Sequence, residues 1–219
     1  MPKELNAIYK KLSNHFGPRR WWPGDSDLEV CIGAVLTQNT AWKNVEKAIA
    51  NLKKSGKLEL PHLTAMPEKK LAALIKPSGY YNLKAKRLRA LLNFLASCNS
   101  GDWRGYLRGL KLETAREKLL SVYGIGPETA DSILLYAAQR RTFVIDAYTL
   151  RFGGRYGIFP QNTNYESARE YFMNKLPRKV KLYNEYHALI VALGHNYCKP
   201  KPLCNECPLG KNCAYAQTR

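Results

Sequence analysis

The sequence predicts an all-α protein, and three observations support that prediction. Apolar residues recur at intervals of three and four through most of the chain, as they do on one face of an α-helix. Strand-like alternation is absent except in RRTFVID at 140–146, which is short. Compact turns of Gly, Pro and Asn separate the helical stretches. At 219 residues the chain could form one large domain or two small ones.

The expected helices follow one another along most of the chain. The N-terminal stretch places Leu5, Ile8, Tyr9, Leu12 and Phe16 at amphipathic spacing. Thr40 is expected to cap the next helix, which ends near Gly56. The remaining expected helices span 67–79, 84–97 (with Leu88, Leu91, Leu92 and Leu95 on one face), 113–124, 127–139, 163–176 and 181–198.

The charge balance favours a polyanionic partner. Lys and Arg total 35, against 17 Asp and Glu, which gives a net charge of +18. Nucleic acid is the first candidate and an acidic membrane surface is the second. No apolar run approaches the roughly 20 residues that span a bilayer, and the polar N-terminus does not resemble a signal peptide. We therefore expect a cytoplasmic, nucleoid-associated monomer that does not enter a membrane.

The stretch VYGIGPETAD at 122–131 forms a turn between two expected helices. Gly124 and Gly126 allow backbone angles that other residues avoid, and Pro127 suits the first position of a helix. The N–H groups of such a turn can point at an anion, so the hairpin could grip a DNA phosphate without reading sequence. The alternative is an ordinary helix–helix turn.

Asp146 follows the short apolar run and precedes another expected helix. Asp is favoured as an N-cap, where it contributes about 1 kcal/mol. It could also be a catalytic carboxylate held at a helix start. The two roles are compatible.

Four of the six cysteines lie within the last 22 residues. Their spacing is C-x5-C-x2-C-x5-C, at Cys198, Cys204, Cys207 and Cys213. Crowded cysteines in a cytosolic chain indicate a metal centre rather than disulfides. Zinc and a [4Fe–4S] cluster both fit four thiolates, and spacing alone leaves the choice open.

These motifs resemble, in order and over nearly the whole chain, the endonuclease III branch of the helix-hairpin-helix DNA glycosylases; LTQNT at 36–40 and GYYNLKAKRL at 79–88 share the likeness. The resemblance implies a two-lobed helix-hairpin-helix glycosylase fold. One lobe would be 24–136, ending in the hairpin at about 113–136, and the other 1–23 with 137–219. It further implies double-stranded DNA with a damaged base between the lobes, and a [4Fe–4S] cluster in loop 198–213. The first cysteine gap is one residue shorter than in endonuclease III.

The sequence departs from endonuclease III two residues after the second hairpin glycine. Bifunctional members carry there a lysine whose amine forms a Schiff base and cuts the strand, whereas this chain has Glu128. A carboxylate cannot form a Schiff base, so a monofunctional enzyme is expected. Glu128 could line the base pocket or simply interact favourably with the helix dipole.

Three of the four tryptophans, Trp21, Trp22 and Trp42, lie near the LTQNT motif. They could be core packing. However, WWP…LTQNTAW resembles the 3-methyladenine DNA glycosylases, in which aromatic rings sandwich the flipped base, and some of which carry a Glu at the lysine position. Alkylated purines are cationic, and Trp is the best cation–π surface. A cationic base leaves readily, so Asp146 could suffice by stabilising the sugar cation and orienting water.

The candidate site is completed by residues around these motifs. Gln38 or Asn39 could fill the gap left by the flipped base, although Asn39 could instead cap a helix. His195 could line the pocket or be a buried structural histidine. The expected base pocket is Trp21, Trp22, Pro23, Trp42, Glu128 and His195, and the expected DNA contacts are Gln38, Asn39, Gly124, Gly126 and Thr129.

Three other functions remain open on sequence grounds. A bifunctional oxidised-pyrimidine glycosylase and lyase would need a lysine elsewhere. A thymine or uracil mismatch glycosylase would also lack the lysine. A non-catalytic DNA-binding module with a structural metal would not need Asp146.

Overall fold

A computed structural model describes residues 1–19, 21–56 and 58–218, and this part of the chain contains helices and turns but no strand. The all-α prediction is confirmed. The chain divides into two compact units: unit 1 comprises 1–21 and 141–219, and unit 2 comprises 22–140. The boundaries expected from the sequence lay at 23/24 and 136/137.

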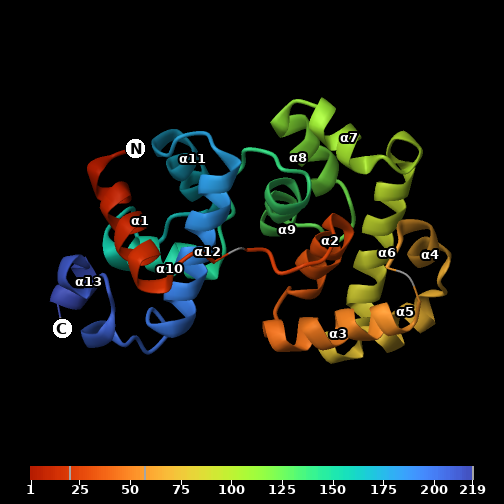
Figure 1. Ribbon diagram of the computed structural model, residues 1–219, viewed down its shortest axis with the longest axis horizontal. Helices are drawn as coiled ribbons and strands as arrows, with labels where there is room; N and C mark the ends of the chain where they lie inside the picture. Colours follow the sequence, from red (N-terminus) through yellow and green to blue (C-terminus); the bar gives the residue numbers. More distant parts are fainter. Residues whose placement is uncertain (20, 57, 219) are drawn as a thin grey trace. The chain divides into compact units, whose positions relative to one another are not determined.

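Unit 2 is built around one buried helix, α2 (Asp27–Leu36), in which every residue from Leu28 to Leu36 is buried. The helix α6 (Tyr81–Ser97) packs against α2 and buries Leu88, Leu91, Leu92 and Leu95, as predicted. Figure 1 shows α6 beside α4 and α5. The other elements of unit 2 are α3 (Trp42–Lys54), α4 (Leu60–Ala65), α5 (Glu68–Leu74), η1 (Lys76–Ser78), η2 (Cys98–Gly101), α7 (Trp103–Gly109), α8 (Leu112–Leu120), α9 (Pro127–Ser132) and the π-helical segment η3 (Ile133–Ala137).

Unit 1 is organised by α12 (Val180–Asn196), which packs against both α1 (Lys3–Phe16) and α10 (Ala147–Tyr156) (Figure 1). Its core is aromatic: Phe143 stacks on Phe172 with ring centroids 4.4 Å apart, and Tyr186 meets both rings edge-on. The remaining elements are α11 (Tyr165–Lys175), η4 (Cys204–Glu206), η5 (Gly210–Asn212) and α13 (Ala214–Gln217).

Two local expectations need correction. Thr40 does not cap α3, because the N-cap is Ala41 and no side chain bonds there. No helix was assigned to α2, whose apolar residues surround the helix and therefore show no period. A capping signal was present, since Ser26 Oγ accepts a hydrogen bond of 3.2 Å from the Glu29 N–H.

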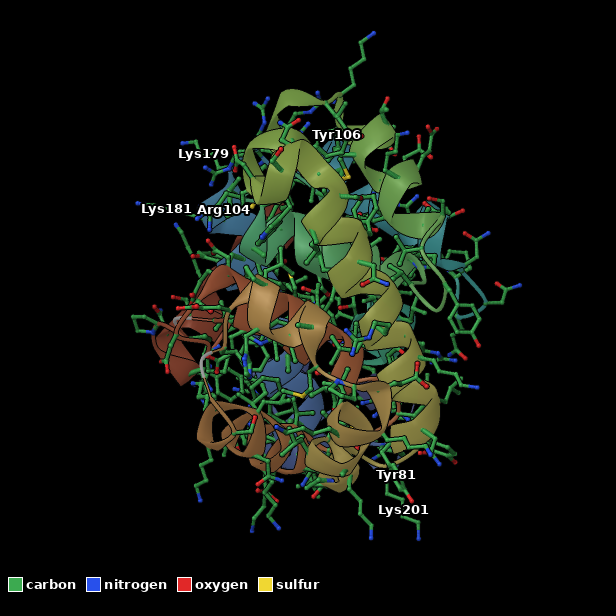
Figure 2. All side chains as sticks on the ribbon, turned by 90° about the vertical axis from the view of Figure 1, so that its right-hand side faces the viewer. Tyr81, Arg104, Tyr106, Lys179, Lys181 and Lys201 are labelled. Carbon is green, nitrogen blue, oxygen red and sulfur yellow. The ribbon has the colours of Figure 1, made fainter. Side chains whose placement is uncertain are left out.

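The surface carries many of the positive charges. Lys179, Lys181 and Lys201 of unit 1 are exposed, and Figure 2 shows them at the surface. Within the described residues, no helix combines the length and the hydropathy that a membrane span requires.

Candidate DNA-binding and catalytic site

The hairpin joins α8 to α9 through a turn that depends on one glycine. Gly124 has φ +78°, in the left-handed region, and a Cβ there would clash with the Arg87 side chain. Gly126 has φ −91°, which any residue can adopt, so the expectation of unusual angles holds for Gly124 but not for Gly126. A Cβ on Gly126 would point into open space, and α9 begins at Pro127 as predicted.

A buried ion pair joins the two arms of the hairpin. Arg116 of α8 lies with Nε 3.2 Å and 3.1 Å from the two carboxylate oxygens of Asp131 on α9. The side chains are 9% and 0% exposed. Breaking such a pair leaves a costly buried charge, so the pair opposes separation of the arms.

Gln38 is bonded to the hairpin and to α6. Its amide donates to the Gly124 carbonyl at 3.1 Å and to the Thr129 hydroxyl at 3.0 Å. Its carbonyl accepts from Arg87 Nη1 at 2.5 Å. The structure therefore brings together three of the predicted DNA-binding residues, and the buried Thr129 hydroxyl is directed at Gln38 rather than at solvent.

A buried lysine stabilises the backbone beside the turn that carries Gln38. Lys84, 1% exposed, donates 2.7 Å hydrogen bonds to the carbonyls of Leu36 and Ser78. Asn39, at the exposed tip, adopts φ +51° and does not cap α3, so the capping alternative for it is wrong. Strained, exposed positions of this kind cluster at functional sites.

An aromatic group lies in unit 2. The Trp22 ring meets Trp42 edge-on with centroids 5.4 Å apart and an interplanar angle of 82°, and its centroid lies 5.3 Å from that of Tyr136. Gly33 makes room for Trp22, since a Cβ there would lie 3.2 Å from the indole Nε1. Trp22 and Trp42 are both partly exposed.

Tyr136 was missed by sequence reasoning. It lies in η3, where α9 widens into a π-helical segment. Such segments occur frequently at functional sites, but they have no signature in a single sequence. A buried tyrosine in an apolar run is indistinguishable there from core packing.

The other predicted pocket residues are more scattered. Glu128 is exposed in the first turn of α9, where a carboxylate is favoured by the helix dipole. Pro23 is exposed in unit 2, and Trp21 is half-buried in unit 1. These positions leave both interpretations of Glu128 open.

Asp146 is the N-cap of α10, as predicted. Its Oδ1 accepts hydrogen bonds from the Thr149 N–H at 2.7 Å and the Thr149 hydroxyl at 2.8 Å. Its Oδ2 lies 3.6 Å from His187 Nε2. Burial by itself would raise the pKa of Asp146, but His187 and Thr149 outweigh it and lower that pKa. The carboxylate is thus held in its charged form.

His187, which was not predicted, is the histidine that approaches Asp146. It is buried in the middle of α12. His195, eight residues later in the last turn of that helix, is exposed and is therefore not a buried structural histidine. Its predicted place in a base pocket stays a prediction.

The four C-terminal cysteines line one pocket, together with Arg155, Tyr197 and Tyr215 among others. No disulfide joins any of these four cysteines. Arg155 of α10 approaches Cys198 Sγ at 3.7 Å and donates to the Lys199 carbonyl at 2.6 Å. In the described part of the chain, no three His, Cys, Asp or Glu side chains are placed to hold a single metal ion.

The loop nevertheless suits a thiolate-bound centre. Gly210 permits close approach of its two arms, because a Cβ there would strike the Cys204 carbonyl. Burial raises the pKa values of Cys207 and Cys213, and hydrogen bonds from backbone N–H groups to the sulfurs offset that rise only in part. Such N–H groups and a nearby guanidinium stabilise thiolate ligands, so the residues present fit a four-cysteine cluster.

Comparison with known proteins places these features in context. Residues 32–178 match the sequence model of the HhH-GPD superfamily base excision DNA repair proteins. A Methanocaldococcus jannaschii protein for which DNA repair glycosylase activity is proposed is 45% identical over 210 residues, 95% of each chain. Endonuclease III of Thermotoga maritima is 30% identical over 193 residues, 88% of this chain and 84% of that protein. The structure of H. pylori 3-methyladenine DNA glycosylase bound to 1,N6-ethenoadenine superposes with TM-score 0.72 and 30% identity, covering 85% of this chain and 95% of that one.

Proposed function

This chain belongs to the HhH-GPD superfamily of base excision DNA repair proteins and is therefore a DNA glycosylase, and we propose that its substrate is an alkylated purine in double-stranded DNA. It hydrolyses the N-glycosidic bond of a flipped 3-methyladenine or 7-methylguanine. It leaves an intact abasic site, and it acts as a monomer.

The observation that carries the proposal is the aromatic group of Trp22, Trp42 and Tyr136. A cationic purine is attracted to the face of an indole ring. Because Trp22 and Trp42 meet edge-on, the base stacks on one ring face rather than in a gap between parallel rings. The 30% identity to an H. pylori 3-methyladenine DNA glycosylase supports the same substrate class.

The chemistry assigned to Asp146 follows from its hydrogen bonding. Oδ1 accepts two hydrogen bonds from Thr149, so we assign the interaction with substrate to Oδ2, which lies 3.6 Å from His187 Nε2. When the bond from C1′ to the purine breaks, its electron pair passes to the base and neutralises the base's positive charge. The negative charge on Oδ2 stabilises the sugar cation and orients a water molecule. The water adds to C1′ and releases a proton to solvent. While Asp146 acts on the sugar, the hairpin binds the phosphates of the DNA backbone.

For the cysteine loop, the proposal includes a [4Fe–4S] cluster held by Cys198, Cys204, Cys207 and Cys213. When bound, the cluster would cross-link the loop and would take no part in base removal. The loop is tied to α10, the helix that Asp146 caps, through Arg155.

The alternative function, a lyase that cuts the strand, requires an amine nucleophile. The 30% identity to Thermotoga maritima endonuclease III is the observation that favours this alternative. Lys84 has the lowered pKa of a reactive lysine, about 8, because of burial and the charge of Arg87. However, its amine is buried and bonded to the Leu36 and Ser78 carbonyls, so it is not available to attack a sugar.

A panel of duplexes tests the proposal. Each duplex carries one lesion: 7-methylguanine, an oxidised pyrimidine, or thymine opposite guanine. Base release and strand cleavage are scored separately, with and without alkali. We expect release of 7-methylguanine and strand cleavage only after alkali. Release of thymine or an oxidised pyrimidine but not of 7-methylguanine would exclude the alkylpurine assignment.

A matched pair of tryptophan variants tests the aromatic group itself. Trp22→Ala should slow alkylpurine release by about 1–3 kcal/mol, the range for base–aromatic stacking, and leave affinity for undamaged DNA unchanged. Trp103→Ala is the control, because Trp103 is buried in α7. It should lower the melting temperature and all activities together. The same proportional loss in Trp22→Ala would identify Trp22 as core packing.

A further inference from the structure

The two carboxylate oxygens of Asp146 have different partners. Thr149 holds Oδ1 with both its N–H and its hydroxyl. Oδ2 faces His187 Nε2 at 3.6 Å, which is longer than a hydrogen bond but within the range of an ion pair. Oδ2 therefore interacts with His187 electrostatically.

His187 is fixed where it lies. The helix α12 packs closely on α10, because Gly194 has no side chain and a Cβ there would strike the Tyr148 ring. The Phe143 ring meets His187 edge-on with centroids 6.3 Å apart. The side chains of His187 and Asp146 are only 5% and 13% exposed.

We propose that His187 is the positioning residue of the catalytic carboxylate: its ring nitrogen, 3.6 Å from Oδ2, fixes one end of the Asp146 carboxylate while Thr149 fixes the other. The inference rests on the proposed role of Asp146 and adds a residue that no sequence motif indicates. His187 touches neither the base nor the sugar; it acts through Asp146.

The electrostatic balance explains why such a residue is needed. Burial alone raises the pKa of Asp146, and the close approach of the His187 ring nitrogen is the main influence that reverses that shift, ahead of the hydrogen bonds from Thr149. Tyr183 and Tyr186, on the same helix, stay neutral because burial raises their pKa values, and Glu4 of α1 acts on Tyr186. Without His187, the protonated form of Asp146 would persist to higher pH.

The test compares His187→Leu, which removes the ring nitrogen, with His187→Gln, which keeps an N–H donor. Single-turnover base release is measured against pH, and DNA affinity is measured separately. In His187→Leu the acid limb of the rate should move up by about one pH unit or more, with partial recovery of the rate at alkaline pH and unchanged DNA affinity. In His187→Gln the limb should lie nearer to wild type.

The control for general damage to α12 is Leu189→Ala, because Leu189 is buried about 200° around the helix from His187. It should lower the melting temperature without moving the acid limb. A rate loss in His187→Leu that is equal at every pH would overturn the proposal and leave His187 a packing residue.

A readout without DNA separates this inference from the proposed function. The Asp146 carboxyl carbon is titrated by NMR in the free protein, with Asp146→Asn used to assign its resonance. The pKa should be higher in His187→Leu than in wild type. Equal values overturn the inference, whatever the substrate proves to be. Failure of wild type to release alkylpurines overturns the proposed function and leaves this titration intact.

Discussion

Removing one partner of the buried hairpin pair should destabilise the protein strongly. Arg116 and Asp131 are nearly inaccessible, and both carboxylate oxygens lie within 3.2 Å of the guanidinium Nε. Loss of one partner from such a pair costs about 3–5 kcal/mol. For a chain of this length about 2–4 °C of melting temperature is lost per kcal/mol. Arg116→Met should therefore melt roughly 6–20 °C below wild type.

The decisive assay is a double-mutant cycle of thermal or urea unfolding. The double variant Arg116→Met with Asp131→Leu replaces the pair by apolar side chains and should recover most of the loss, because buried pairs and well-packed apolar residues are nearly equivalent. Asp25→Asn is the surface control; Asp25 pairs with Lys53 but is 87% exposed, so its loss should lower the stability far less than either hairpin variant. Single variants that each cost under about 1 kcal/mol and add in the double variant would refute the reasoning.

Three further predictions concern other parts of the molecule. Gly126→Ala should weaken DNA binding at unchanged melting temperature, whereas Gly124→Ala should lower the melting temperature because of its φ of +78° and the Arg87 side chain; equal behaviour in melting and binding assays would contradict this. Lys84 has a pKa of about 8, below its unfolded value, so the unfolded chain binds more protons between about pH 8 and 10.5. Wild type should gain stability relative to Lys84→Met as the pH rises through that window, and a flat difference in urea unfolding would argue against it. Purified protein should contain about four irons per chain, and Cys204→Ser should lose iron and thermal stability while changing the base-release rate of the remaining folded protein less; full iron retention would exclude Cys204 as a ligand.

Much of the fold could be predicted because its elements have strong local signals. The amphipathic α6 and the Asp146 cap depend on residues adjacent in sequence. By contrast α2 is buried on all sides, so its helical period is invisible. The π segment η3 arises from a change of backbone hydrogen bonding that single-residue propensities do not encode.

In the site, too, the features with a local sequence signal could be predicted and those set by tertiary packing could not. The hairpin turn and the cysteine loop are contiguous motifs, so the sequence alone shows both; the structure confirms the hairpin, and the cluster in the loop stays a prediction. His187 was not predicted, although it lies on the same helix as His195. Which histidine approaches Asp146 is decided by how α12 packs on α10, and that packing depends on Gly194 and Tyr148. Likewise Gln38 was identified, but its bonds to Arg87 and the hairpin come from residues far away in sequence.

The most direct test of the central claim is single-turnover release of 7-methylguanine from duplex DNA by wild type and Asp146→Asn, with the free base quantified by chromatography. The account predicts release by wild type without strand cleavage and without a borohydride-trapped complex. Asp146→Asn should bind the duplex with wild-type affinity and release the base about 10²–10³ times more slowly, as expected for loss of a charge aimed at the transition state. A fully active Asp146→Asn, or a trapped covalent complex with wild type, would contradict it.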